Sequence, residues 1–233
     1  MMNYTKTFFK TGFALIAAAF LTGCATINSM NSGDPRDPWE STNRVIFKVN
    51  ETIDGKVLKP LAEGYQNVVP SPIRTGVSNF FSNLSDLATA IHHLLQLDFK
   101  NSGQSVSRFV INSTMGILGL TDVASNLGIN RTVEDTGQTL GSYGVKQGPY
   151  LVLPLFGPST VRDGLGRVVD LAVDPFNEIV KEREAKISGN ILRVVDTRAQ
   201  LLAAEEAFEA LAFDRYVSVR NAYLAIRESQ VKD

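Results

Sequence analysis

The segment from Gly137 to Gly166 restricts the possible folds of this 233-residue chain more than any other stretch. It contains seven of the eighteen glycines and three of the nine prolines, a density that interrupts any long helix. It also contains the apolar run 150–156, YLVLPLF, although exposed loops are usually polar. We therefore expect a packed core, another protein or lipid to cover this segment.

The composition is that of a folded protein without a nucleic-acid-binding surface. Hydrophobic residues make up 44% of the chain and charged residues 20%. The net charge is −1 and no block of like charges occurs, whereas binding to nucleic-acid phosphates requires a basic patch. We therefore expect no nucleic acid among the partners.

The N-terminus has the features of a bacterial secretory signal that ends in a lipidation site. Two lysines precede an apolar stretch, residues 13–21, that is too short to span a bilayer. The following residues, Leu21-Thr22-Gly23-Cys24, resemble a lipobox. That resemblance implies removal of residues 1–23 and attachment of diacylglyceryl and N-acyl groups to Cys24; the alternative is an ordinary secretory signal with a chance cysteine. Since Cys24 is the only cysteine, internal disulfides and cysteine-cluster metal sites are excluded.

The predicted lipid anchor also indicates a location. Three acyl chains hold a protein at a membrane far more firmly than one. Residue 25 is Ala rather than Asp, which by resemblance to lipoprotein sorting signals favours the outer membrane. We expect a lipid-anchored protein on the periplasmic side of the outer membrane, with residues 24–36 as a polar tether.

The rest of the chain predicts a single all-α domain of amphipathic helices, residues 37–228, followed by a short tail, 229–233. Strand alternation is poor and no internal linker marks a domain boundary. The first helix is expected to begin at a capping box formed by Asp37 and Glu40 and to end at Asp54-Gly55.

Proline positions and apolar spacing predict the other helices. One begins near Pro60 and another at Ser71-Pro72, with a break or new cap at Ser85-Asp86. The last two helices are expected over about residues 188–211 and 214–228.

A further helix, predicted from Ser102, separates apolar from polar residues clearly. Val106 and Val110 fall on one side, and Arg108 and Asn112 fall on the other. Such a face covers either a shared protein core or a lipid leaflet, and the spacing alone favours neither.

Within the glycine-rich segment the predictions are weaker. Residues 150–155 are expected to form at most a short edge strand, because Pro154 interrupts them. Pro158-Ser159 predicts the start of a helix that ends near Asp174-Pro175.

The sequence contains no recognisable catalytic or metal-binding pattern. His92 and His93 are adjacent on a helix and point about 100° apart, so they cannot chelate one ion as residues four apart do. We expect them to be polar residues at the helix surface or an interface. Nucleophile elbows, zinc-protease motifs, phosphate-binding loops and calcium loops are all missing from the sequence. We therefore expect neither an enzyme nor a bound cofactor or metal; a lipid hydrolase would need a nucleophile with a positioned base.

Several motifs, which occur in order over about residues 34–225, resemble one protein family. The matching pieces are Asp37-Pro38-Trp39-Glu40, Ser71-Pro72-Ile73-Arg74, Arg108-Phe109-Val110-Ile111-Asn112, Gly137–Val145, Gly157–Asp163 and Asp196-Thr197-Arg198-Ala199. This set resembles the MlaA (VacJ) family of outer-membrane lipoproteins, which belong to a phospholipid-transport pathway.

The resemblance implies a ring of helices in the periplasmic leaflet of the outer membrane, held by trimeric porins and pierced by an amphipathic channel. Phospholipids mislocalised to the outer leaflet would pass through that channel to a soluble periplasmic carrier of the MlaC type, which maintains lipid asymmetry. The alternative is a structural lipoprotein that scaffolds porins and moves no lipid.

On this hypothesis the glycine-rich segment forms a wall of the channel, because glycines let the backbone approach a lipid closely. The alternative is a tightly packed core segment that holds the helices in place. The candidate lining residues are Gly141, Tyr143, Gly144, Gly148, Tyr150, Leu153 and Phe156.

Overall fold

The computed structural model describes residues 33–209 and 213–232, so the predicted signal segment and Cys24 lie outside the described residues. The prediction of an all-α fold is confirmed, with one small hairpin added. The elements are α2 (Glu40–Ile53), the π-helix η1 (Asp54–Leu58), α3 (Lys59–Val68), α4 (Ser71–Leu95), α5 (Phe99–Thr114), α6 (Val123–Asn126), α7 (Thr136–Ser142), β1 (Tyr150–Leu153), β2 (Gly157–Thr160), α8 (Val161–Ala172), α9 (Pro175–Ile179), α10 (Arg183–Glu209) and α11 (Arg215–Lys232).

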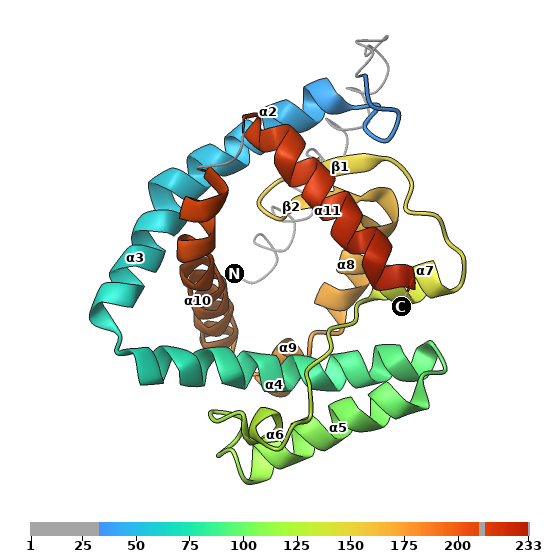
Figure 1. Ribbon diagram of the computed structural model, residues 1–233. Helices are drawn as coiled ribbons and strands as arrows, with labels where there is room; N and C mark the ends of the chain where they lie inside the picture. Colours follow the sequence, from blue (N-terminus) through green and yellow to red (C-terminus); the bar gives the residue numbers. More distant parts are fainter. Residues whose placement is uncertain (1–32, 210–212, 233) are drawn as a thin grey trace, which may run out of the picture.

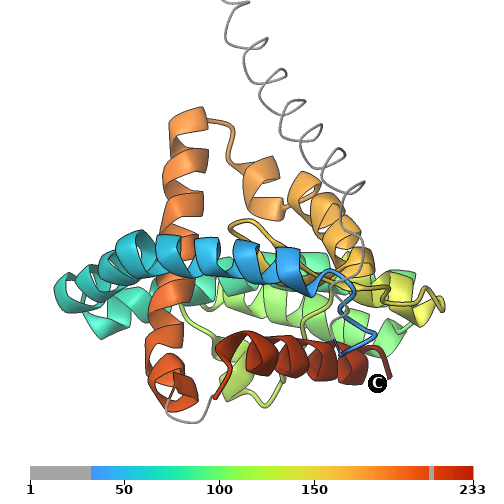
Figure 2. The ribbon, with the colours of Figure 1, turned by 90° about the horizontal axis from the view of Figure 1, so that it is seen from above.

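The helices form a ring (Figure 1). α2, η1 and α3 make one side and α4 makes the next; α7, α8 and α11 close the ring on the side opposite α3, whereas α10 packs on α3 and α4 (Figure 1). α5 folds back along α4 on the outer side of the ring, and the β1–β2 hairpin lies beside α11 (Figure 1). Seen at right angles to this view, α10 runs across the direction of α2 and α3 (Figure 2).

The first helix does not end at Asp54-Gly55 as predicted, because η1 joins α2 to α3 without a break. A proline inside a regular α-helix clashes with the carbonyl four residues earlier, and Pro60 is the second residue of α3, just after η1. The wider turn of a π-helix relieves this clash, so the chain bends and continues. Asp54 does not terminate the helix; its carboxylate accepts hydrogen bonds from Arg198 at 2.7 and 2.8 Å.

The predicted capping box at Asp37 is also wrong. α2 begins at Glu40, and Asp37 is fully buried. Its carboxylate accepts hydrogen bonds from the Tyr216 hydroxyl and from Arg220, both on α11. Asp34 also pairs with Arg220 at 3.2 Å, and the Arg36 carbonyl accepts a hydrogen bond from the Tyr150 amide, so residues 34–36 of the expected tether already contact the fold.

α4 passes through Ser85-Asp86 without the predicted break. Asp86 is 1% exposed and pairs with two arginines, Arg108 on α5 at 3.1 Å and Arg131 at 2.9 Å. A Ser-Asp pair in a sequence resembles a helix cap. Here Asp86 lies inside α4 and instead forms ion pairs with arginines from other parts of the chain.

α5 has the predicted apolar and polar faces, but the polar face is the buried one. Arg108 and Asn112 are buried, whereas Val106 is 44% exposed and Val110 is 50% exposed. Asn112 and Arg108 both donate to the Asp122 carboxylate, at 2.9 Å each. The helix therefore turns its ion-pairing side to the protein and its apolar side outward.

The expected single strand is paired in a hairpin, and the expected helix start at Pro158-Ser159 is wrong because both residues lie in β2. Thr160 caps α8 by accepting a hydrogen bond from the Asp163 amide. The free edge of β1 is satisfied by two amide side chains of α2: Asn43 bonds to the backbone at residues 150 and 152, and Asn50 bonds to the backbone at residues 153 and 155. An exposed edge strand is thereby closed without a third strand.

The C-terminal helices agree better with prediction. α10 begins at Arg183, earlier than expected, and α11 continues to Lys232 through most of the predicted tail. The predicted inner face of α11 is confirmed, since Tyr216, Leu224 and Arg227 are buried.

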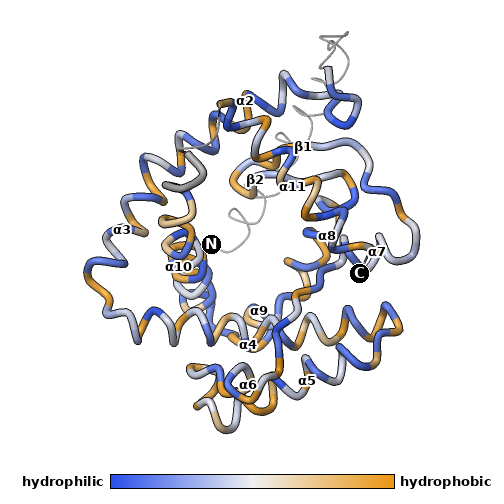
Figure 3. Tube along the Cα trace, viewed as in Figure 1, coloured by the Kyte–Doolittle hydropathy of each residue, from blue (hydrophilic) through white to orange (hydrophobic). Residues whose placement is uncertain are grey.

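The apolar core is small. Tyr150, Val152, Tyr216 and Leu224 form it, at the junction of the hairpin, α2 and α11. Among the described residues, nineteen polar or charged side chains are buried against eleven apolar ones. Large apolar side chains are instead exposed on most helices, and apolar positions recur along α3, α4 and α5 (Figure 3). None of the described helices combines the length and the apolarity needed to cross a bilayer.

The pairing of Asp86 with Arg108 can be tested by substitution. We expect Asp86→Asn to lower the free energy of unfolding by about 3 kcal/mol, because it removes the buried anion that Arg108 and Arg131 share and leaves Arg108 only its partly exposed partner Asp122. Asp214→Asn is the matched control: Asp214 pairs with Arg44 at a partly exposed site, and asparagine retains its helix-capping capacity. That control should cost about 1 kcal/mol or less. Denaturant unfolding in detergent, followed by circular dichroism, measures the free energy of unfolding of both variants. An equal loss in the two variants would contradict a structural role of the buried Asp86 ion pairs.

Candidate functional site

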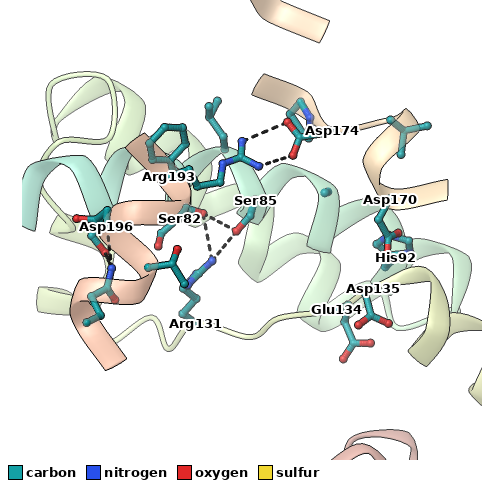
Figure 4. A pocket seen from close by; sticks show the side chains of 18 residues that line it. Ser82, Ser85, His92, Arg131, Glu134, Asp135, Asp170, Asp174, Arg193 and Asp196 are labelled. Atoms are coloured by element: carbon teal, nitrogen blue, oxygen red, sulfur yellow. Dashed lines mark hydrogen bonds and ion pairs between the residues drawn. The ribbon is translucent and has the colours of Figure 1, made fainter. Parts of the chain in front are cut away.

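A cavity of about 410 Å³ lies on the inner side of the ring, between α4, α10, the α8–α9 region and the connection that precedes α7 (Figure 4). We call it the central cavity. Its lining is strongly charged, although the residues come from four separate parts of the chain. The ionisable groups are Arg131, Arg193, Glu134, Asp135, Asp170, Asp174, Asp196 and His92.

Two smaller cavities adjoin the central one. One, of about 300 Å³, shares Asp135, Asp170 and Asp174 with it and also contacts Arg227 on α11. The other, of about 260 Å³, shares Ser78, Asp196 and Gln200 with it and extends to the start of α4. The three cavities are therefore neighbours, and ionisable side chains line each of them.

Both arginines of the central cavity are held by carboxylates. Arg193 makes two hydrogen bonds to Asp174, at 2.6 and 3.2 Å, and its guanidinium lies 4.8 Å from the centre of the Phe81 ring. Arg131 pairs with the buried Asp86, as described above, and points toward Ser85 (Figure 4). Glu134 and Asp196 have no arginine or lysine partner within ion-pair distance in the described chain, so the lining has an excess of negative charge.

Burial and hydrogen bonding move the pKa values of these carboxyls in opposite directions. Burial raises the pKa of Glu134, and a hydrogen bond from Gln96 offsets this only in part. Burial also acts to raise the pKa of Asp170, but hydrogen bonds from His92 and Thr136 outweigh it and lower that pKa. Asp170 is therefore held as the anion, whereas Glu134 takes up a proton more readily than an ordinary glutamate.

The wall next to α11 is closed by a buried network around Arg227. This guanidinium donates to Asp163 at 3.0 Å and to Asp135 at 2.8 and 2.9 Å. Burial acts to raise the pKa of Asp163, but hydrogen bonds and charge from Arg227, with a hydrogen bond from Tyr223, lower it to about 2. The network joins α7, α8 and α11, so it holds the ring closed beside the cavity.

The two histidines are buried rather than at the helix surface, and they connect α4 to the inner wall. The His92 imidazole lies 3.0 Å from the Thr139 hydroxyl and 3.5 Å from Asp170, and the His93 imidazole lies 2.9 Å from Thr132. Thr139, His92 and Asp170 have the order of a nucleophile, a base and an acid. However, Thr139 is 7% exposed within α7 and does not line the central cavity, so a substrate there would not reach it. Within the described residues no cluster of His, Cys, Asp or Glu could hold a metal ion.

The structure distributes the predicted lining residues among different environments. Tyr150 is fully buried in the apolar core, which is the place that the packed-core alternative gives it. Gly141 is buried in α7, where a Cβ would lie 2.7 Å from Arg162. These two residues are surrounded by protein.

The other predicted lining residues are more accessible. Tyr143 is 65% exposed, with its hydroxyl bonded to the Leu95 carbonyl, and Phe156 is 52% exposed beneath the Arg167 guanidinium. Leu153 is half-buried in β1. Gly144 and Gly148 are turn residues with φ of +85° and +70°. None of the seven residues lines the row of three cavities, and contact between them and lipid stays a prediction.

Comparison with known proteins decides the family. Residues 35–230 match the family model described as MlaA lipoprotein. The chain is 37% identical to the intermembrane phospholipid transport system lipoprotein MlaA of Haemophilus influenzae, over 94% of this chain and 89% of that one. It is 35% identical to the protein of the same name in Escherichia coli K12, over 89% of this chain and 83% of that one.

This chain belongs to the MlaA lipoprotein family.

A solved structure supports the assignment to the MlaA family. It comes from work on the structural basis for maintenance of bacterial outer membrane lipid asymmetry. It superposes on this chain with a TM-score of 0.72 at 33% identity, covering 84% of this chain and 98% of the other. An uncharacterised protein of Rickettsia typhi is 36% identical, over 84% of this chain and 78% of that one.

Sequence reasoning missed the charged cavities of this MlaA-family chain. Asp174 was predicted only as the end of a helix, and no motif marks Glu134, Asp135 or Asp170. One signal was available: α4, α8 and α10 carry acids and arginines on faces that alternate with apolar ones. A charged inner face and an apolar outer face give the same periodicity as a core helix, so spacing alone could not separate them.

The close contact between α7 and α8 can be tested at the glycines of these two helices. A Cβ on Gly166 would lie 2.7 Å from the Gly137 nitrogen, so one of the two backbones would have to shift. We expect Gly166→Ala to destabilise the protein by about 1–3 kcal/mol. The control is Gly103→Ala in α5, where nothing lies within 4 Å; it should be neutral or stabilise by up to about 1 kcal/mol. Thermal unfolding in detergent measures both, and an unchanged midpoint for Gly166→Ala would contradict the close helix contact.

The raised pKa of Glu134 predicts a pH-dependent effect on stability. A carboxyl with a raised folded-state pKa favours folding while it is protonated, and this contribution is lost as pH rises through the folded value. Glu134→Gln mimics the protonated form, so we expect it to be more stable than the wild type at pH 7 and no more stable in acid below the ordinary glutamate pKa. Asp163→Asn should do the opposite at pH 7, because its lowered pKa stabilises the fold above the ordinary aspartate pKa. Unfolding curves between pH 4 and pH 8 test both signs.

Proposed function

We propose that this chain is an outer-membrane lipoprotein that removes mislocalised phospholipids from the outer leaflet and passes them to a periplasmic carrier. This activity maintains the different lipid composition of the two leaflets. The observation that carries the proposal is the combination of a row of three neighbouring cavities lined by ionisable side chains with large apolar side chains exposed on most helices.

This arrangement suits a molecule that is charged at one end and apolar at the other. A phospholipid headgroup that enters hydrocarbon costs several kcal/mol or more. In the ring, the headgroup can move along the charged cavities while the acyl chains remain against apolar surface. The barrier falls because the protein replaces the water around the headgroup, and no ATP is needed for that step.

The same surfaces explain how the ring is held at a membrane. Acyl groups on Cys24 anchor the chain from the periplasmic side, and the outward-facing side chains of α4 and α5, such as Ile91 and Val110, contact the lipid of the leaflet. A trimeric porin and a soluble carrier of the MlaC type are the proposed protein partners. The phospholipid itself is the cargo, and no cofactor takes part.

Surface labelling of cells tests the proposal. A strain that lacks the gene should expose more phosphatidylethanolamine at the cell surface, as measured with a membrane-impermeant amine reagent and mass spectrometry of extracted lipid. The wild-type gene should restore the low level, whereas Cys24→Ser should not, since the ring is then not anchored. If surface phospholipid is unchanged in the deletion strain and the purified protein carries no lipid, a scaffold that moves no lipid is the better account.

A further inference from the structure

The cavity at the start of α4 contains an arginine without a counter-ion. Arg74 is half-buried, its Nε is enclosed without a hydrogen-bond partner, and its guanidinium forms no ion pair or hydrogen bond in the described part of the chain. Every other buried or half-buried arginine described by the structure pairs with a carboxylate. A guanidinium cannot lose its proton, so Arg74 remains a charge that an anion would stabilise.

The surroundings of Arg74 are those of an anion site. The cavity has a volume of about 260 Å³ and is the one that adjoins the central cavity through Ser78, Asp196 and Gln200. Ser71, Thr75 and Ser78 lie on the same face of α4 as Arg74 and place three hydroxyls along the wall. Hydroxyls and a guanidinium are both donors to phosphate oxygens, and the planar fork of arginine matches two of them at once.

We propose that this Arg74 cavity is a phosphate subsite of the lipid path, in which the Arg74 guanidinium binds the phosphodiester of a phospholipid headgroup. The proposal rests on the proposed function of lipid transfer and adds to it a defined point of contact. The volume is smaller than that of a site that encloses a whole ligand. The headgroup therefore enters alone, and the acyl chains stay outside.

A carboxylate in the same cavity determines which headgroup fits best. Asp196 is 4% exposed and is held by neutral donors, the Tyr65 hydroxyl at 3.0 Å and the Gln200 amide at 2.8 Å. It forms no ion pair with Arg74, although both residues line the cavity. A cation and an anion held apart in this way match the phosphate and the ammonium of a zwitterionic headgroup. The subsite therefore favours phosphatidylethanolamine over phosphatidylglycerol.

Binding measurements on the full-length lipoprotein in detergent, stripped of lipid, test the subsite. The probes are dihexanoyl phosphatidylethanolamine, dihexanoyl phosphatidylglycerol and inorganic phosphate, and the readout is calorimetry. We expect Arg74→Gln to weaken binding of the short-chain phosphatidylethanolamine by about tenfold or more, the effect of losing hydrogen bonds to a charged group. Arg183→Gln is the matched control: Arg183 has the same charge, is exposed at the start of α10, and should bind as the wild type does.

The preference between headgroups has its own variant. Wild-type protein should bind the phosphatidylethanolamine probe about two- to fivefold more tightly than the phosphatidylglycerol probe, and Asp196→Asn should remove that difference. Arg74→Lys, which keeps the charge but loses the fork, should bind more weakly than the wild type and more tightly than Arg74→Gln.

Three results would overturn the inference. The first is equal phospholipid affinity in Arg74→Gln, Arg183→Gln and the wild type. The second is Arg74-dependent binding of inorganic phosphate without binding of either lipid, which would make this a site for free phosphate. The third, which needs no variant, is failure of the phosphatidylethanolamine probe to protect Arg74 of the wild-type protein from phenylglyoxal. If Arg74→Gln binds phospholipid normally and the wild-type gene still lowers surface phosphatidylethanolamine in the deletion strain, only the subsite is wrong. If the wild-type gene does not lower it, the proposed function itself is wrong.

Discussion

Buried arginine–carboxylate contacts hold this ring together. A ring has an inner and an outer surface, so its helices cannot all meet around one apolar core, and the core that exists joins only α2, α11 and the hairpin. At the other junctions Arg108 joins α4 to α5, Arg198 joins α10 to η1, and Arg227 joins α11 to α7 and α8. Such pairs add little net stability over apolar residues of the same shape, but removing one partner is costly. They therefore specify which surfaces meet.

This use of arginine explains why the burial pattern is the reverse of that in a water-soluble domain. A buried guanidinium needs several acceptors, and Arg108 obtains them from Asp86, Asp122, the Ser125 hydroxyl and the Ile129 carbonyl. Each such network occupies the side of a helix that would otherwise hold leucine or valine. The apolar side of α5 consequently faces outward, where a lipid leaflet can cover it at no cost to hydration.

The helical class, most helix positions and the inner face of α11 could be predicted from the sequence. Apolar spacing and proline positions depend directly on these features. The errors occurred where a tertiary contact replaced a local one. Asp37 and Asp86 look like caps in sequence, yet their carboxylates pair with arginines that are far away in the chain or on a neighbouring helix. Pro60 suggested the start of a separate helix, whereas the π-helix that ends at Leu58 joins α2 to α3 without a break.

The candidate site was harder to predict than the fold for a related reason. The glycine-rich segment was expected to bring backbone close to lipid, but Gly137 and Gly166 bring α7 close to α8, and Gly141 leaves space for Arg162. The lining of the central cavity comes from residues spread over α4, the segment 131–135, the α8–α9 region and α10, and no short motif contains them. Apolar periodicity shows that a helix has two faces, but it does not show which face water occupies.

The reversed burial also ties the stability of the ring to its surroundings. With a small apolar core and many apolar side chains exposed, the protein gains much of its hydrophobic stabilisation only when lipid or a partner covers the outside. The cavities have the opposite requirement, since their carboxylates Glu134 and Asp196 lack a cationic partner in the described chain and depend on polar donors. Transfer of the molecule from membrane to water would therefore expose the apolar surface and leave the cavities unchanged. A phospholipid has the same two requirements, because its headgroup needs polar partners and its acyl chains need apolar surface.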